Sequence, residues 1–254
     1  MARSLVLGLE VVLADGRVVG VNTDRGPVEA DCVFIAEGDA AQLLAREGLE
    51  RVMRPHYAQG VKAVFRLDAR EIERRFEIGP DEGVAQEWML RNGKLAGRNV
   101  RLNFGAFLYT NRDTLSLGAV FPLDKLARNG VADHPHVLER LKRTPGLASY
   151  LEDAEQVAYG AKVIRLGGVD ETPAWVRDGL AVGGGGLGLG LEIPYPNFIA
   201  PAITTGICFA EAVLAIRARG ADYTRAELER DYVARLKATP DYANARLIRR
   251  WPAA

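Results

Sequence analysis

Two short apolar runs far apart in the sequence constrain this chain more than any other feature. The first, residues 32–36, is continuous, which is typical of a strand buried on both faces of a sheet. The second, residues 180–182, follows a turn at Asp178-Gly179 and is equally apolar. We predict that both runs are strands of one sheet, formed by the two ends of the chain.

The segment between these two runs has a different hydrophobic pattern. Residues 61–67 alternate like a half-buried strand, and residues 100–109 and 114–120 resemble paired strands joined by a turn. Helices are expected at 68–76, 135–143 and 147–153, and a further strand at 159–164. This pattern predicts an antiparallel sheet with helices to one side. The fold class is therefore mixed, α/β with an α+β insertion.

The flanking regions add more elements. Residues 9–13 and 18–23 should form a hairpin around Asp15-Gly16, and a helix should follow residue 39. An apolar helix is expected from about Pro201 to Gly220. Thr224 and Glu227 form a capping box for an amphipathic helix over 224–236.

Composition excludes several function classes. The chain has 254 residues with 33 Lys and Arg against 33 Asp and Glu, so it lacks the basic excess of a generic nucleic-acid binder. Its two cysteines are too few for a disulfide scaffold, an Fe–S cluster or a four-thiolate zinc site. His134 and His136 suit an exposed turn better than a metal site, and no G-x-S-x-G hydrolase motif occurs. We expect no metal.

No membrane span is expected either, because the most apolar late stretch, residues 198–216, is broken by Pro201, Gly206 and Glu211. These features predict a cytoplasmic protein, with peripheral contact at the inner face of the cell membrane as the alternative.

A glycine-rich loop over residues 183–190 follows the second apolar run. It matches G-x-G-x-x-G literally, but Pro194 and Pro196 forbid the helix that a dinucleotide-binding fingerprint needs, and Glu192 comes too early for its acidic residue. Two interpretations remain: a tight loop without a ligand, or a loop whose bare backbone lies against a flat or charged ligand. Glu37 follows the first apolar run, where ligands of α/β sheets gather, although it could equally supply charge to a helix N-terminus.

Three segments resemble the family of FixC and electron-transfer-flavoprotein:quinone oxidoreductases, which is related to geranylgeranyl reductases. They are residues 15–45, residues 105–118 with the sequence GAFLYTNRDTLSLG, and residues 178–184 with the following helix. The resemblance covers about residues 8–245.

The resemblance implies a partial FAD-binding α/β domain with an inserted antiparallel-sheet substrate domain. It divides the chain into 1–56 (first part of the FAD domain), 57–165 (substrate or acceptor domain), 166–220 (second part of the FAD domain) and 221–254 (C-terminal helical segment).

The implied site residues fall into two groups. Tyr109 and Asn111 would face the flavin and bind substrate, with simple cross-strand packing as the alternative. The implied cofactor-binding residues are Glu37, Gly38, Gly183, Gly184, Gly185, Gly186, Gly188, Asn197, Thr205 and Gly206. N–H groups from Ile203 to Gly206 would point at the reduced flavin. No catalytic residue is identified.

Two departures from the family pattern shape the functional expectation. Family members begin with 100 or more residues that carry the true ADP-binding fingerprint, and this chain starts after that point. Gly184 also stands where the family has an acid on the ribityl side. We therefore expect FAD to bind weakly or not at all to the chain alone.

The implied activity is FAD-dependent electron transfer from a reduced flavoprotein, such as an electron transfer flavoprotein, to a quinone-like acceptor. A further partner would be a chain carrying the ADP-binding segment. The alternatives are a split subunit that serves as a docking module and a geranylgeranyl-reductase-like enzyme.

Overall fold

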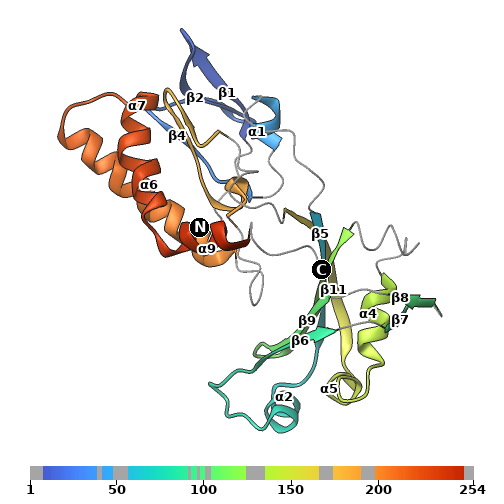
Figure 1. Ribbon diagram of the computed structural model, residues 1–254. Coiled ribbons are helices and arrows are strands. Elements are labelled where there is room, and N and C mark those ends of the chain that lie inside the picture. Colours follow the sequence, from blue (N-terminus) through green and yellow to red (C-terminus); the bar gives the residue numbers. More distant parts are fainter. Residues whose placement is uncertain are drawn as a thin grey trace. The chain divides into compact units, whose positions relative to one another are not determined.

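The computed structural model describes residues 8–38, 42–47, 57–90, 93–95, 98–100, 104–123, 135–165, 174–189 and 198–248. The chain forms two compact units (Figure 1). The first unit combines Met1–Arg54 with Arg165–Ala254, and the second is Pro55–Ile164. The second unit begins and ends within two residues of the expected middle segment, 57–165, whereas residues 221–254 are part of the first unit.

The first unit is built from both ends of the chain. Its elements are β1 (Gly8–Ala14), β2 (Arg17–Thr23), β3 (Gly26–Glu29), β4 (Val33–Ile35), α1 (Gln42–Arg46), β12 (Val176–Arg177), β13 (Leu180–Val182), η3 (Gly184–Leu187), α6 (Ile199–Ala218), α7 (Arg225–Leu228), the π-helical turn η4 (Glu229–Val233), α8 (Ala234–Lys237) and α9 (Pro240–Ile248).

The two apolar runs are strands of one sheet, as predicted, and the structure shows them as direct neighbours. β4 pairs with β13 in parallel, in register from Val33 opposite Leu180 to Ile35 opposite Val182. The sheet order is β12-β13-β4, and β1, β2 and β3 form a separate antiparallel sheet. The β1–β2 hairpin turns at Asp15 and Gly16, which both have positive φ, as expected for this turn.

The core of the first unit lies between this sheet and the C-terminal helices. Leu180, Ala181 and Val182 are fully buried, and they belong to one apolar cluster with Cys208 of α6 and Tyr232 of η4. Cys208 is therefore a packed apolar residue, as its place in the apolar helix indicates. α6 begins at Ile199, two residues before the expected start.

The second unit is an antiparallel sheet with helices. Its elements are β5 (Tyr57–Arg66), α2 (Ala69–Phe76), β6 (Ala85–Leu90), β7 (Gly93–Leu95), β8 (Arg98–Val100), β9 (Phe104–Thr110), β10 (Thr114–Pro122), α4 (Pro135–Lys142), α5 (Ala148–Leu151) and β11 (Glu155–Arg165). The main sheet has the order β11-β5-β10-β9-β6, and β7 and β8 pair separately.

Alternation along the strands decides which face of this sheet is buried. Alternate residues of β5 and β10, such as Val61, Phe65, Leu115 and Leu117, join a buried cluster that includes helix α4. Asp68 caps α2 by accepting from the Arg70 N–H at 2.9 Å. The mixed helix and sheet architecture agrees with the fold class predicted from the sequence.

Candidate functional site

The glycine loop leaves β13 at the edge of the sheet where β4 also ends. Gly183 is extended, and its N–H donates to the Ile35 carbonyl at 2.9 Å. A Cβ at Gly183 would lie 2.0 Å from Cζ of Phe34, so no side chain fits there. The first glycine of the loop is therefore required by packing against β4.

The rest of the loop is a compact 3₁₀ turn. Gly184 and Gly188 have left-handed φ values of 63° and 66°, which glycine adopts readily. The Gly184 N–H donates to Oγ1 of Thr205 at 2.8 Å, and the Gly188 N–H donates to the Gly185 carbonyl at 2.9 Å. A Cβ at Gly186 would lie 3.2 Å from Leu44. The backbone is thus less bare than its composition suggests.

Gly185 is the loop glycine that remains half-buried, whereas Gly183, Gly184, Gly186 and Gly188 are buried. The loop thus presents its backbone mainly at one position. The turn is short and is not the start of a long helix, which agrees with the rejection of the dinucleotide fingerprint.

Glu37 and Gly38 reach the same edge from β4. The Glu37 carboxylate accepts from the N–H groups of Leu43 and Leu44 at 3.0 and 2.9 Å, so it caps the start of α1. Gly38 has a φ of 71°, and its carbonyl oxygen lies 3.6 Å from the position of a Cβ on Gly186. The structure therefore brings Gly38 beside the loop, while both carboxylate oxygens of Glu37 are engaged by α1. A cofactor contact of Glu37 stays a prediction.

Thr205 ties the loop to α6. Its side chain is fully buried, and its hydroxyl donates to the Ala202 carbonyl at 2.8 Å while accepting from Gly184. Because α6 begins at Ile199, the N–H groups of residues 203–206 lie inside the helix, where they bond to carbonyls four residues earlier. They do not form the free N-terminal donors expected from a helix starting near Pro201. Asn197 lies outside the described residues.

An aromatic cluster under the loop was not foreseen from the sequence. The rings of Phe34 and Phe209 stack at 4.3 Å, and Tyr232 packs edge-on against both. The Tyr232 hydroxyl donates to the Val182 carbonyl at 2.6 Å, immediately before the loop. Burial raises the pKa of Tyr232, so the hydroxyl stays protonated and keeps this hydrogen bond.

Tyr109 lies on the face of the second unit's sheet opposite the core. Its neighbours Ala106 and Leu108 point into the core, so alternation places Phe107 and Tyr109 on the other face. Their rings stack at 5.0 Å with 10° between planes. Phe107 lies over Gly118, where a Cβ would come within 2.1 Å of the ring. Burial, and secondarily the charge of Glu87, raise the pKa of Tyr109. Phe107 is a candidate contact that the sequence did not single out.

Asn111 lies at the turn between β9 and β10. Its side-chain amide donates to Oγ1 of Thr114 at 3.1 Å and to Oγ of Ser116 at 3.3 Å, and Ser116 is opposite Tyr109 in the strand register. Asn111 also lines a pocket of about 320 Å³. The other residues lining it are Ala69, Ile72, Glu73, Ile78, Gly79, Pro80, Asp81, Glu82, Gly83, Thr110 and Arg112.

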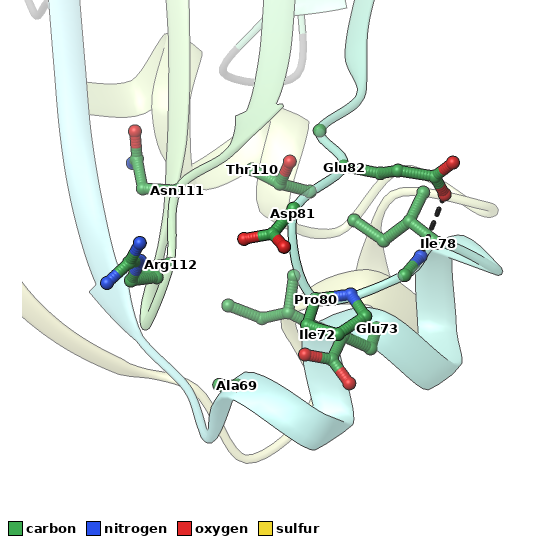
Figure 2. A pocket seen from close by; sticks show the side chains of 12 residues that line it. Ala69, Ile72, Glu73, Ile78, Pro80, Asp81, Glu82, Thr110, Asn111 and Arg112 are labelled. Carbon is green, nitrogen blue, oxygen red and sulfur yellow. Dashed lines mark hydrogen bonds between the residues drawn. The ribbon is translucent and has the colours of Figure 1, made fainter.

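Figure 2 shows Asn111 and Arg112 on the opposite side of this pocket from Asp81. The pocket lies between α2 and the hairpin turn, where β10 begins opposite Arg66 at the end of β5. Asn111 thus has local partners of its own, and its role in substrate binding stays a prediction.

No family model matches the chain. Two solved structures share its fold. A geranylgeranyl bacteriochlorophyll reductase-like protein from Thermoplasma acidophilum is 16% identical with a TM-score of 0.64, over 96% of this chain and 61% of that one. A probable FAD-dependent monooxygenase, pqsL from Pseudomonas aeruginosa, is 13% identical with a TM-score of 0.54, over 94% of this chain and 66% of that one. The fold is that of FAD-binding flavoproteins.

Sequence comparison is more specific. Protein FixC from Salmonella typhi is 33% identical over 229 residues, which cover 88% of this chain and 52% of FixC. The probable electron transfer flavoprotein-quinone oxidoreductase YdiS from Escherichia coli (strain K12) is 30% identical over 220 residues, covering 86% of this chain and 49% of YdiS. The chain is thus homologous to FixC and YdiS, which confirms the predicted resemblance. It spans about half the length of the curated relatives it matches.

Proposed function

We propose that this chain forms the part of a flavin-dependent oxidoreductase that holds the reactive end of FAD and the electron acceptor. The observation that carries the proposal is the meeting of Gly38 with the loop Gly183–Gly188 at the carboxyl ends of two parallel strands. Ligands of open α/β sheets bind at this edge.

The residues at this edge suit a flat, neutral ring system better than a phosphate. Gly185 is half-exposed backbone, and described residues around the loop, such as Gly38, Gly184 and Thr205, bring no cationic side chain. The acid expected on the ribityl side is replaced by Gly184, which removes one polar contact. These features support contact with the isoalloxazine and ribityl part of FAD, which would supply the redox chemistry when bound.

At this edge the protein's own residues hold the backbone of the glycine loop in place. Tyr232 holds the Val182 carbonyl, Phe34 fills the space beside Gly183, and Thr205 fixes Gly184. Because three separate elements hold the loop, its backbone is preorganised before any ligand arrives. Preorganisation lowers the entropic cost of binding.

The acceptor is proposed to be quinone-like, with a reduced electron transfer flavoprotein as donor. YdiS carries this activity in its name, and the sheet face of the second unit opposite its core offers the stacked, half-buried rings of Phe107 and Tyr109. Flat aromatic ligands stack on such rings. A cytoplasmic location with peripheral membrane contact would suit a lipid-soluble acceptor. The docking-module alternative predicts a complex that takes up no flavin, and the geranylgeranyl-reductase alternative predicts a lipid alkene as the electron acceptor.

Flavin titration of a loop variant tests the proposal. Gly185→Val places a branched side chain at the half-buried position of the loop, so flavin uptake should be abolished. Gly160→Val is the matched control, because a Cβ at Gly160 in β11 meets nothing within 4 Å. Both variants are titrated together with the half of Salmonella FixC that this chain does not match. Equal flavin affinity of Gly185→Val and the control would remove the loop from the site.

A further inference from the structure

The second unit carries a pocket between helix α2 and the turn that joins β9 to β10. Its volume is about 320 Å³, and it is lined by residues of α2, by the loop 78–83 and by the turn 110–112. We call it the α2 pocket. Pockets that hold small molecules begin at roughly 300 Å³, so the α2 pocket suits a ligand of about amino-acid size.

One wall of the α2 pocket is apolar and is fixed by the core of the second unit. Ile72 is 2% exposed and belongs to the buried cluster, and Ile78 packs against that cluster. A ligand in the pocket therefore meets aliphatic side chains that can contact an aliphatic chain of its own. Removing such apolar surface from water stabilises the bound state.

The loop that forms a second wall is held by hydrogen bonds. Oε2 of Glu82 accepts from the Gly79 N–H at 2.8 Å, which closes the loop on itself (Figure 2). Oγ1 of Thr110 accepts from the Val84 N–H at 2.9 Å and ties the end of the loop to β9. The pocket is thus formed before a ligand arrives, which lowers the entropic cost of binding.

Charged groups of opposite sign line the α2 pocket without forming ion pairs with one another. Arg112 lies on the opposite side of the pocket from Asp81, and Glu73 adds a carboxylate from α2 (Figure 2). Among the described residues, no ion pair joins Arg112 to Glu73 or Asp81. By contrast, Glu71 of the same helix does not line the pocket and pairs with two arginines of α2 at 2.8 and 3.0 Å. The charges in the pocket are therefore available to a ligand.

A ligand that carries both kinds of charge matches this lining. The guanidinium of Arg112 presents N–H donors in the fork geometry that fits a carboxylate. The carboxylates of Asp81 and Glu73 only accept, so they fit a protonated amine, which donates up to three hydrogen bonds. A ligand with one kind of charge would leave the opposite side of the pocket unmatched. The described residues include no group of three or more His, Cys, Asp or Glu that could hold a metal ion.

We infer that the α2 pocket binds a small zwitterion, with its carboxylate at Arg112 and its protonated amine at Asp81 and Glu73. The class comprises amino acids and ω-amino acids whose aliphatic part lies against Ile72 and Ile78. This site shares no residue with the glycine loop, so it adds a binding function to the proposed oxidoreductase and does not depend on flavin.

Three probes with the same carbon chain length test the inference. They are 5-aminopentanoate with both charges, 1,5-diaminopentane with positive charges only, and glutarate with negative charges only. Each is titrated into the full chain and followed by ¹H–¹⁵N NMR. We expect 5-aminopentanoate to bind most tightly and to shift the amide signals of Gly79, Asp81 and Arg112.

Variants of the two charged sides assign the orientation of the ligand. Arg112→Gln should weaken 5-aminopentanoate about three- to fivefold, the effect of one exposed ion pair, and should not weaken 1,5-diaminopentane. Asp81→Asn should weaken both of these probes by a similar factor. Arg70→Gln and Glu77→Gln are the matched controls, because both side chains are exposed beside the pocket but do not line it.

Each other outcome contradicts the inference in a distinct way. Tighter binding of 1,5-diaminopentane than of 5-aminopentanoate would show an acidic surface that attracts any cation, and tighter binding of glutarate would show an arginine that attracts any anion. Equal weakening by the control variants, or no binding of 5-aminopentanoate, would also overturn the inference. Because no flavin is present in this titration, its result is independent of the proposed function.

Discussion

At the scale of single residues, the glycine loop is explained by its neighbours. The Phe34 ring leaves no room for a side chain at Gly183, and the left-handed backbone at Gly184 and Gly188 favours glycine. A Cβ at Gly186 would press on Leu44 at 3.2 Å. Gly185 is the glycine of Gly183–Gly188 whose backbone is partly exposed. We therefore propose Gly185 as the residue of this loop that contacts a ligand.

The packing role of Gly183 gives the first prediction. Gly183→Ala should lower the free energy of unfolding by about 1–3 kcal/mol, because the new methyl group overlaps the Phe34 ring and must displace it. Gly160→Ala, where nothing lies within 4 Å, should cause no loss. Urea unfolding followed by circular dichroism measures both. Equal stability of the two variants would show that Phe34 moves aside freely.

At the scale of elements, α2 is held by charge at its first turn. Glu71 forms salt bridges with Arg74 at 2.8 Å and Arg75 at 3.0 Å, and Arg75 also donates to the carbonyls of Tyr150 and Glu152. Glu71 therefore orients the arginine that ties α2 to α5. The hydrogen bonds from Arg74 and Arg75 lower the pKa of Glu71 from 4.5 to about 2.

The lowered pKa sets the direction of a pH effect. A carboxyl group with a lower pKa in the folded state stabilises the fold above its unfolded pKa of 4.5, and this contribution is lost as the pH falls toward about 2. Glu71→Gln should thus be less stable than the unaltered chain at pH 7, and the difference should shrink between pH 4.5 and 2. Thermal unfolding across this range measures it, with Glu73→Gln as the control on the same helix. If the stability difference between Glu71→Gln and the unaltered chain does not change with pH, the ion-pair explanation is wrong.

The sequence patterns of individual strands, turns and helices predicted most of the fold. The apolar runs at 32–36 and 180–182 predicted two strands of one sheet, and Asp15-Gly16 predicted the first hairpin, because each strand and turn has a local signal; the parallel pairing of β4 with β13 was not predicted. The contact of Tyr232 with Val182 joins residues 50 positions apart, and the π-helical turn that carries Tyr232 has no sequence signature. Phe107 was missed for the same reason, since its packing on Gly118 depends on strand register.

At the scale of the whole molecule, the chain consists of two compact units. The relatives that it matches are about twice as long as the matched region. The pyrophosphate of FAD normally rests on the N-terminus of a long helix behind a glycine turn. Among the described residues, the glycine string instead forms the 3₁₀ turn Gly184–Leu187. We therefore expect the two phosphates of a bound FAD to find their main partners outside the described residues.

The visible spectrum and FAD content of the purified chain, alone and mixed with the unmatched half of Salmonella FixC, test the central claim most directly. We predict a colourless protein alone, because the contacts that we propose at Gly38 and Gly185 would reach only the ribityl and isoalloxazine end of FAD. We predict a yellow complex with near-stoichiometric FAD once the other half is added. A chain that is yellow by itself would contradict the predicted division of the site, and a complex that stays colourless would contradict the flavoprotein assignment.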